Sequence, residues 1–163
     1  MSEISKHRSP CMALLWSLAI PGFGQLYNQD YLVGLVLVML EFVINVKADL
    51  NLAIYYSFRG QFLEVDQVAR IQWLLFYPCV YGFSMWHAYN RGAEINRWLG
   101  PEEAGVGIPS KTHLNGCLLG FAIGGTLGVI YSFYIGPVLC GLIGGIIGAT
   151  VGSIFEYLVR LRK

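Results

Sequence analysis

THLNGCLLGFAIGGTLGVIYSFYIGPVLCGLIGGIIGATVGSIF, residues 112–155, contains no Asp, Glu, Lys or Arg. A helix that crosses a membrane needs about 20 apolar residues, so this run is long enough for two such helices. Gly136 and Pro137 interrupt the run near its middle. We therefore predict two membrane spans, residues 114–134 and 137–157, joined by a tight turn.

Glycine recurs at every fourth position in both predicted spans. Residues four apart lie on nearly the same face of a helix, so the glycines form stripes along which two backbones can approach closely in lipid. The pattern resembles the glycine-zipper hairpins of bacterial membrane and envelope proteins. Either the two helices pack only on each other, or a remaining glycine face binds another copy or a partner. The predicted helix-packing residues are Gly116, Gly120, Gly124, Gly128, Gly141, Gly144, Gly145, Gly148 and Gly152.

The composition of the whole chain indicates a membrane protein. It has 163 residues, of which 55% are hydrophobic and 13% are charged, whereas a soluble domain carries about 25% charged residues. We infer that lipid covers the excess apolar surface, and we expect an all-α integral membrane protein. The net charge of +1 provides no basic surface for nucleic acid.

Two further spans are predicted in the N-terminal part, at residues 31–46 and 71–90. Trp73 and Trp86 lie near the two ends of the second span, as in the aromatic belts of membrane proteins. Pro78 is expected inside that span, where neighbouring groups satisfy the carbonyl that a proline leaves unbonded.

Residues 9–28 are uncharged, but Pro21 and Gly22 interrupt them. The helix that remains is about 15 Å long, roughly half the thickness of the hydrocarbon layer. We therefore predict a half-helix that re-enters the membrane or lies at its interface. The turn comprises residues 21–24, and Gln25 and Asn28 should satisfy backbone groups or meet lipid headgroups.

The distribution of Lys and Arg predicts the orientation, because these residues gather on the cytoplasmic side. With four spans and a cytoplasmic N-terminus, eight Lys and Arg residues lie inside and three outside. If residues 9–28 also crossed, the distribution would be five against six. We therefore predict a multi-pass protein of the cell membrane with both termini in the cytoplasm.

The Gly- and Pro-rich residues 98–111 predict a cytoplasmic linker between a membrane half, residues 1–97, and the glycine hairpin, residues 112–163. Residues 50–58 have helical spacing. They form either a separate short helix on the outer membrane surface or a continuation of the preceding span.

The segment Pro21-Gly22-Phe23-Gly24-Gln25-Leu26-Tyr27-Asn28, with a hydrophobic stretch on each side, resembles the turn of TM2-domain-like bacterial membrane proteins. Residues 76–81 and 85–89 look like the downstream part of longer relatives, which carry an Asp where His87 stands here. The resemblance covers residues 9–97. It implies a membrane protein without a known enzymatic role, and it assigns no catalytic residue.

Glu41 is the acidic residue deepest in a predicted span, about 15 Å from its start. A charge there is costly, so we expect Glu41 to be protonated, paired or facing water. Asn45 lies on the same helix face, and the next span places Tyr77, Tyr81 and Ser84 at a similar depth. Three interpretations remain: a structural clasp between spans, a proton or ion pathway, or an interfacial carboxylate in a thinned bilayer.

A second polar group lies near the cytoplasmic end of the 71–90 span. His87, Asn90, Arg91 and Glu94 share a helix face by their spacing. This face binds lipid headgroups, docks the turn at residues 22–28, or is a solvated helix end.

The sequence contains no motif for a metal, a cofactor or a catalytic centre. Cys11, Cys79, Cys117 and Cys140 lack the spacing of a metal site, and we expect them to be small buried apolar residues. The function predicted is therefore a non-enzymatic membrane scaffold or assembly subunit that packs through its glycine-striped helices. Its partner would be a second copy or another membrane protein. The alternative is an oligomeric channel or small transport component that uses Glu41.

Overall fold

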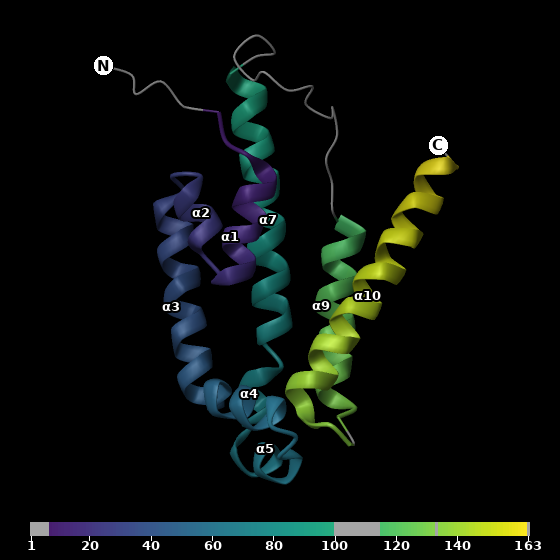
Figure 1. Cartoon of the computed structure of the whole chain (residues 1–163). Helices are drawn as coiled ribbons and strands as arrows, with labels where there is room; N and C mark the ends of the chain where they lie inside the picture. Colours follow the sequence, from purple (N-terminus) through teal and green to yellow (C-terminus); the bar gives the residue numbers. More distant parts are fainter. Residues whose placement is uncertain (1–6, 100–114, 133, 163) are drawn as a thin grey trace. The chain divides into compact units, whose positions relative to one another are not determined.

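The computed structural model describes residues 7–99, 115–132 and 134–162 (Figure 1). Within these ranges every regular element is a helix and no strand occurs, which confirms the all-α prediction. The chain divides into two compact units. Unit 1 comprises residues 1–38 and 84–113, and unit 2 comprises residues 39–83 and 114–163. This division differs from the predicted halves, because α3 (Tyr31–Ala48) and α7 (Tyr77–Leu99) each contribute to both units.

The N-terminal segment of unit 1 is broken into two helices, α1 (Pro10–Ala19) and α2 (Phe23–Tyr27). Ser9 caps α1 by accepting the Met12 N–H, and Pro10 occupies the first turn, where a proline costs no hydrogen bond. The helix ends because Pro21 holds the preceding residue extended. The predicted break is therefore present, but the turn is formed by residues 20–22, and Phe23 and Gly24 already belong to α2.

Gly22 is required at this turn for two reasons. Its φ of 103° lies in the left-handed region, which side chains disfavour. A Cβ at this position would also overlap the Gly34 carbonyl oxygen and lie 2.7 Å from the Val38 side chain. The turn therefore packs directly on the first half of α3.

Two helices in the described ranges are long and apolar enough to cross a membrane by length and composition. They are α3 (Tyr31–Ala48) and α10 (Gly136–Leu161), and they contain the predicted spans 31–46 and 137–157. Of the two shorter apolar helices, α1 and α9 (Asn115–Ile130), α9 has 16 residues and is shorter than the predicted span 114–134. Residues 114 and 133 of this predicted span lie outside the described residues.

The residues between α3 and α7 form three short helices in unit 2. These are α4 (Leu50–Phe58), α5 (Phe62–Val68) and α6 (Ile71–Leu74). Asp49 has a φ of 53° and separates α3 from α4, so residues 50–58 form a separate helix and do not continue the span. The core of unit 2 is built by Ala48, Leu50, Leu74 and Val129, against which Ile54, Trp73 and Val138 pack.

The predicted span 71–90 corresponds to α6 and the beginning of α7 (Tyr77–Leu99). Pro78 is therefore the second residue of α7 rather than the middle of a span, and the prediction of an interior proline is wrong. The first turn of a helix needs no N–H at this position. Trp98 and Leu99, assigned to the linker, are the last residues of α7, and residues 100–111 of the linker lie outside the described residues.

Candidate functional site

Four small or polar residues of α7 form a buried stripe in unit 1: Ser84, Ala88, Gly92 and Asn96. They are four residues apart, so they face the same direction. The N-terminal segment contacts each of them. Ser84 and Ala88 contact α2, whereas Gly92 lies against Pro10 and Asn96 bonds Arg8. We call these four residues the α7 stripe. The sequence analysis did not predict it, although small residues that recur at a spacing of four indicated a packed helix face.

Gln25 lies at the centre of the contact between α2 and the α7 stripe, and it is fully buried. Its Oε1 accepts hydrogen bonds from the hydroxyls of Ser17 (3.2 Å) and Ser84 (3.3 Å). Its Nε2 donates to the Ser84 carbonyl oxygen at 2.8 Å and lies 3.5 Å from His87 Nδ1. Every donor and acceptor position of this amide therefore has a partner, as burial requires.

Ser84 connects the Gln25 amide to the turn. Its hydroxyl donates to Gln25 and also accepts the N–H of Gly22 at 3.1 Å. Gly24 lies where a Cβ would be 2.7 Å from Ala88 and would overlap both Ser17 and the Ala13 carbonyl oxygen. The turn residues predicted to matter, Gly22, Gly24 and Gln25, are thus brought together on α7.

Two asparagines hold the remaining backbone of the N-terminal segment. Asn28 Nδ2 donates to the Ala88 carbonyl oxygen at 2.7 Å. Asn96 Oδ1 accepts the Arg8 N–H at 2.8 Å, and its Nδ2 donates to the Arg8 carbonyl oxygen. The prediction that Gln25 and Asn28 satisfy backbone groups is therefore confirmed, and Asn96 performs the same task without having been predicted.

The polar face of α7 docks on the residue that precedes α3. Asp30 Oδ2 lies 3.8 Å from both His87 Nε2 and Arg91 Nε. Arg91 also donates to Glu94 at 2.8 Å, and this hydrogen bond holds the pKa of Glu94 below its usual range. Of the three interpretations of this face, docking beside the turn fits His87 and Arg91, whereas Asn90 bonds the Trp86 carbonyl oxygen of its own helix.

Glu41 forms a separate polar contact in unit 2. Its Oε1 accepts hydrogen bonds from Tyr77 (3.1 Å) on α7 and from Asn45 (3.3 Å), one turn along α3. The hydroxyl of Tyr77 is therefore the tyrosine donor to the carboxylate. Tyr81 packs against the Tyr77 ring, with the two ring centroids 4.9 Å apart. Ser84, predicted at this depth, belongs instead to the Gln25 contact of unit 1.

The glycine stripes of α9 and α10 face each other, and the two helices run side by side in Figure 1. A Cβ added to Gly120 would overlap the Gly148 carbonyl oxygen, and one added to Gly124 would overlap that of Gly144. The backbones are therefore in direct contact, at a distance that supports Cα–H···O bonds. The predicted close packing of this hairpin is confirmed.

Of the two alternatives left open for the nine glycines assigned to the hairpin, the contacts fit packing of the two helices on each other. Each of the nine faces the opposite helix. Gly141 lies against Val129, and Gly145 lies against Phe121, while the other seven face backbone or, at Gly116, also Glu156. Drift of about 40° between residues four apart spreads the stripe over two faces of an isolated helix, but large side chains of α9 fill the second face.

Glu156 fixes the open end of the hairpin, and sequence reasoning missed it. Its Oε2 accepts the Gly116 N–H in the first turn of α9 at 2.8 Å, and its Oε1 pairs with Arg160. A carboxylate is favoured there by the unpaired N–H groups at a helix N-terminus. The signal was its place as the first charged residue after the uncharged run.

The cysteines do not lie in the protein interior. Cys11 and Cys79 are exposed, and Cys117 and Cys140 are half-buried. The prediction of buried apolar cysteines is therefore wrong, and Cys79 Sγ lies 3.8 Å from the hydroxyl of Thr126.

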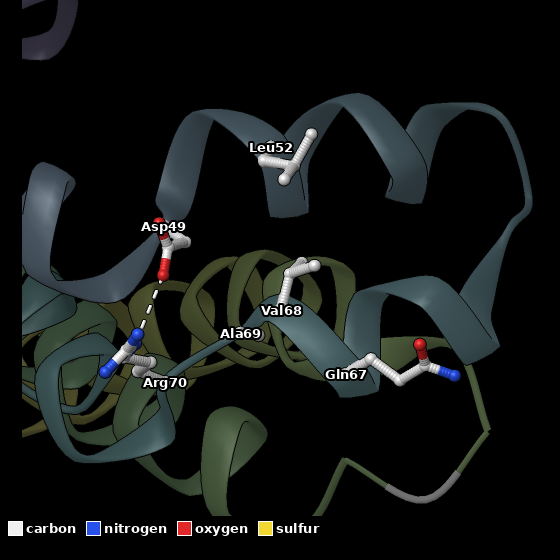
Figure 2. Close-up of a pocket in the computed structure, with 6 residues that line it drawn as sticks. All are labelled: Asp49, Leu52, Gln67, Val68, Ala69 and Arg70. Carbon is white, nitrogen blue, oxygen red and sulfur yellow. Dashed lines mark hydrogen bonds and ion pairs between the residues drawn. The ribbon is translucent and has the colours of Figure 1, made fainter.

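An open depression of about 520 Å³ lies in unit 2 between α4 and the residues that end α5 (Figure 2). Leu52 and Val68 line it, and the ion pair between Arg70 Nε and Asp49 Oδ2, 3.1 Å apart, closes one end. The Arg70 N–H also donates to the Ala48 carbonyl oxygen at 3.2 Å. These bonds tie the α3–α4 junction to the segment before α6, which gives the ion pair a structural role.

Comparisons of this chain with protein-family models, with curated proteins and with solved structures found no match.

Proposed function

We propose that this chain is a non-enzymatic, multi-pass membrane protein that acts as a scaffold or assembly subunit. The observation that carries the proposal is the apolar surface of its two longest apolar helices. Only 22% of the apolar window of α3 and 11% of that of α10 is buried. The core helix of a soluble protein would be mostly covered by its own chain, so exposed helices of this kind favour a lipid environment.

The proposed topology has four spans and a re-entrant N-terminal segment. Helices α7 and α9 would complete the set with α3 and α10, and α7 has 23 residues, about 35 Å at 1.5 Å per residue. The excess of Lys and Arg on one side favours cytoplasmic termini in the cell membrane. The docking of Gln25 and Asn28 on α7 gives the TM2-like turn a structural role, and membership of that family is part of the proposal.

The polar groups within the apolar helices favour a scaffold over a transport protein. Glu41 bonds Tyr77 and Asn45, and Gln25 is bonded on all sides. Such contacts stabilise a fixed arrangement of helices, whereas an ion pathway needs polar groups that face water. The glycine stripes are filled within the chain, so a second copy or another membrane protein would dock on the apolar outer faces.

Reconstitution separates the scaffold from the channel. We expect liposomes that contain only this protein to show no proton or potassium flux above protein-free liposomes. We also expect affinity purification in mild detergent to retain a second copy or a defined membrane complex.

The decisive variants are Glu41→Gln and Glu64→Gln, the second of which changes a carboxylate in α5. Flux that Glu41→Gln abolishes and Glu64→Gln leaves intact would overturn the scaffold and establish the channel.

A further inference from the structure

The depression between α4 and the end of α5 lies where an apolar helix ends. Asp49 directly follows α3, which is long and apolar enough to cross a membrane. The Arg70 N–H bonds the carbonyl oxygen of Ala48, the last residue of that helix. Residues at the end of a membrane span lie at the level of the lipid headgroups. The depression therefore faces headgroups, a placement that rests on the proposed membrane function.

The ion pair at one end of the depression has bonding capacity left for a ligand. Its hydrogen bond joins Nε of Arg70 to Oδ2 of Asp49, so within the described residues the two terminal guanidinium nitrogens and Oδ1 remain available. The two side chains are 70% and 44% exposed, and an exposed ion pair contributes little to stability. Both charges can therefore bind a ligand without the loss of a buried contact.

Two adjacent opposite charges select the charge of that ligand. Arg70 attracts a purely anionic group and Asp49 repels it, and a purely cationic group meets the reverse. A zwitterion satisfies both, because its phosphate can bind the guanidinium while its ammonium binds the carboxylate. A primary ammonium offers three N–H donors to Asp49, whereas a trimethylated ammonium offers none.

We propose that the depression binds the headgroup of a zwitterionic phospholipid with a primary ammonium, that is a phosphatidylethanolamine. Its volume of about 520 Å³ is in the usual range of small-molecule sites. In Figure 2, Leu52 and Val68 lie between the ion pair and Gln67. The two apolar side chains would contact the glycerol methylenes, and the amide would donate to an ester oxygen.

The surface of the same two helices favours a lipid over a free solute. Phe58, at the end of α4, and Leu63, at the start of α5, are 75% and 78% exposed. Apolar side chains this exposed on neighbouring helices are expected where the helices lie in a membrane interface. A lipid provides both the apolar cover and the zwitterion, whereas a free solute provides only the second.

Native mass spectrometry of the full-length protein tests the lipid preference. The protein in mild detergent is titrated separately with dioleoyl phosphatidylethanolamine, phosphatidylcholine and phosphatidylglycerol. We expect phosphatidylethanolamine to bind about fivefold more tightly than either of the others, the ratio that one net hydrogen bond provides. Soluble phosphoethanolamine should not displace it. Displacement at an equal concentration would assign the site to a free solute and overturn the proposal.

Two variants and two matched controls assign the preference to the ion pair. Asp49→Asn introduces a residue type that tolerates the positive φ at this position, and it should abolish the preference over phosphatidylcholine. Arg70→Gln should weaken the binding of all three phosphates alike. Lys47→Gln and Asp66→Asn remove exposed charges that do not line the depression, and both should retain the preference.

Equal affinity of the wild type for the three lipids would overturn the proposal, as would a preference that Asp49→Asn retains. Either result would leave the membrane function standing, because these lipids differ only in their headgroups. A chain that stays soluble and monodisperse without detergent would instead contradict the membrane function itself.

Discussion

Gln25, Asn28 and Glu41 are polar residues in or beside apolar helices, and each bonds another group of the chain. The sequence predicted that these residues needed partners, because an unpaired polar group is costly away from water. For Glu41 it also predicted that Tyr77, Tyr81 and Ser84 lie at a similar depth, since helix length converts directly into depth. It did not predict which of these three side chains faces Glu41: Tyr77 donates to the carboxylate, and Ser84 belongs to a different contact.

Substitutions of Glu41 test whether these hydrogen bonds stabilise the protein. Glu41→Gln keeps an oxygen that accepts from Tyr77 and Asn45, so we expect the stability of the protein to change little. Glu41→Leu removes the acceptor and leaves the Tyr77 hydroxyl without it, which should lower the free energy of unfolding by about 1–3 kcal/mol. Unfolding in detergent, followed by tryptophan fluorescence, measures both. Equal losses in the two variants would show that the hydrogen bonds do not stabilise the protein.

At the scale of helices, glycine repeats predicted the packing of helices better than proline predicted where helices begin and end. The glycine hairpin was predicted correctly because a repeat of four places every glycine on the contact surface. The ends of the helices were less predictable. Pro78 begins α7 because a proline fits a first turn, and Asp49 ends α3 through a positive φ that its residue type does not require. The α7 stripe was missed because it mixes serine, alanine, glycine and asparagine.

The close packing of the hairpin predicts that leucine is destabilising at the glycine positions between α9 and α10 but not at an exposed position of α10. Gly124→Leu and Gly148→Leu place a branched side chain between touching backbones, which should destabilise the hairpin by about 1–3 kcal/mol or more and separate the helices. Thermal unfolding in detergent measures the loss.

Ile146→Leu is the matched control, because Ile146 is exposed on α10. Val129→Leu would be unsuitable, because Val129 is buried against Gly141. If Gly124→Leu were as stable as Ile146→Leu, the close backbone contact would not stabilise the protein.

At the scale of the molecule, composition predicted an all-α protein with apolar outer faces, and the helices agree. The number of spans did not follow as directly, because α7 combines apolar residues with His87, Arg91 and Glu94, and α9 is short. Charge distribution supplies the missing argument, since four spans place eight Lys and Arg residues on one side and three on the other. The topology is therefore the central claim on which the proposed function rests.

Thiol labelling in intact cells tests this topology most directly. Single cysteines replace Ser5, Gln61, Ala104 and Lys163 in a protein without its native cysteines, and an impermeant maleimide is added before or after the membrane is permeabilised. The four-span account predicts that the Gln61 site reacts in intact cells and that the other three react only after permeabilisation. Labelling of the Lys163 site in intact cells, or protection of the Gln61 site, would contradict it.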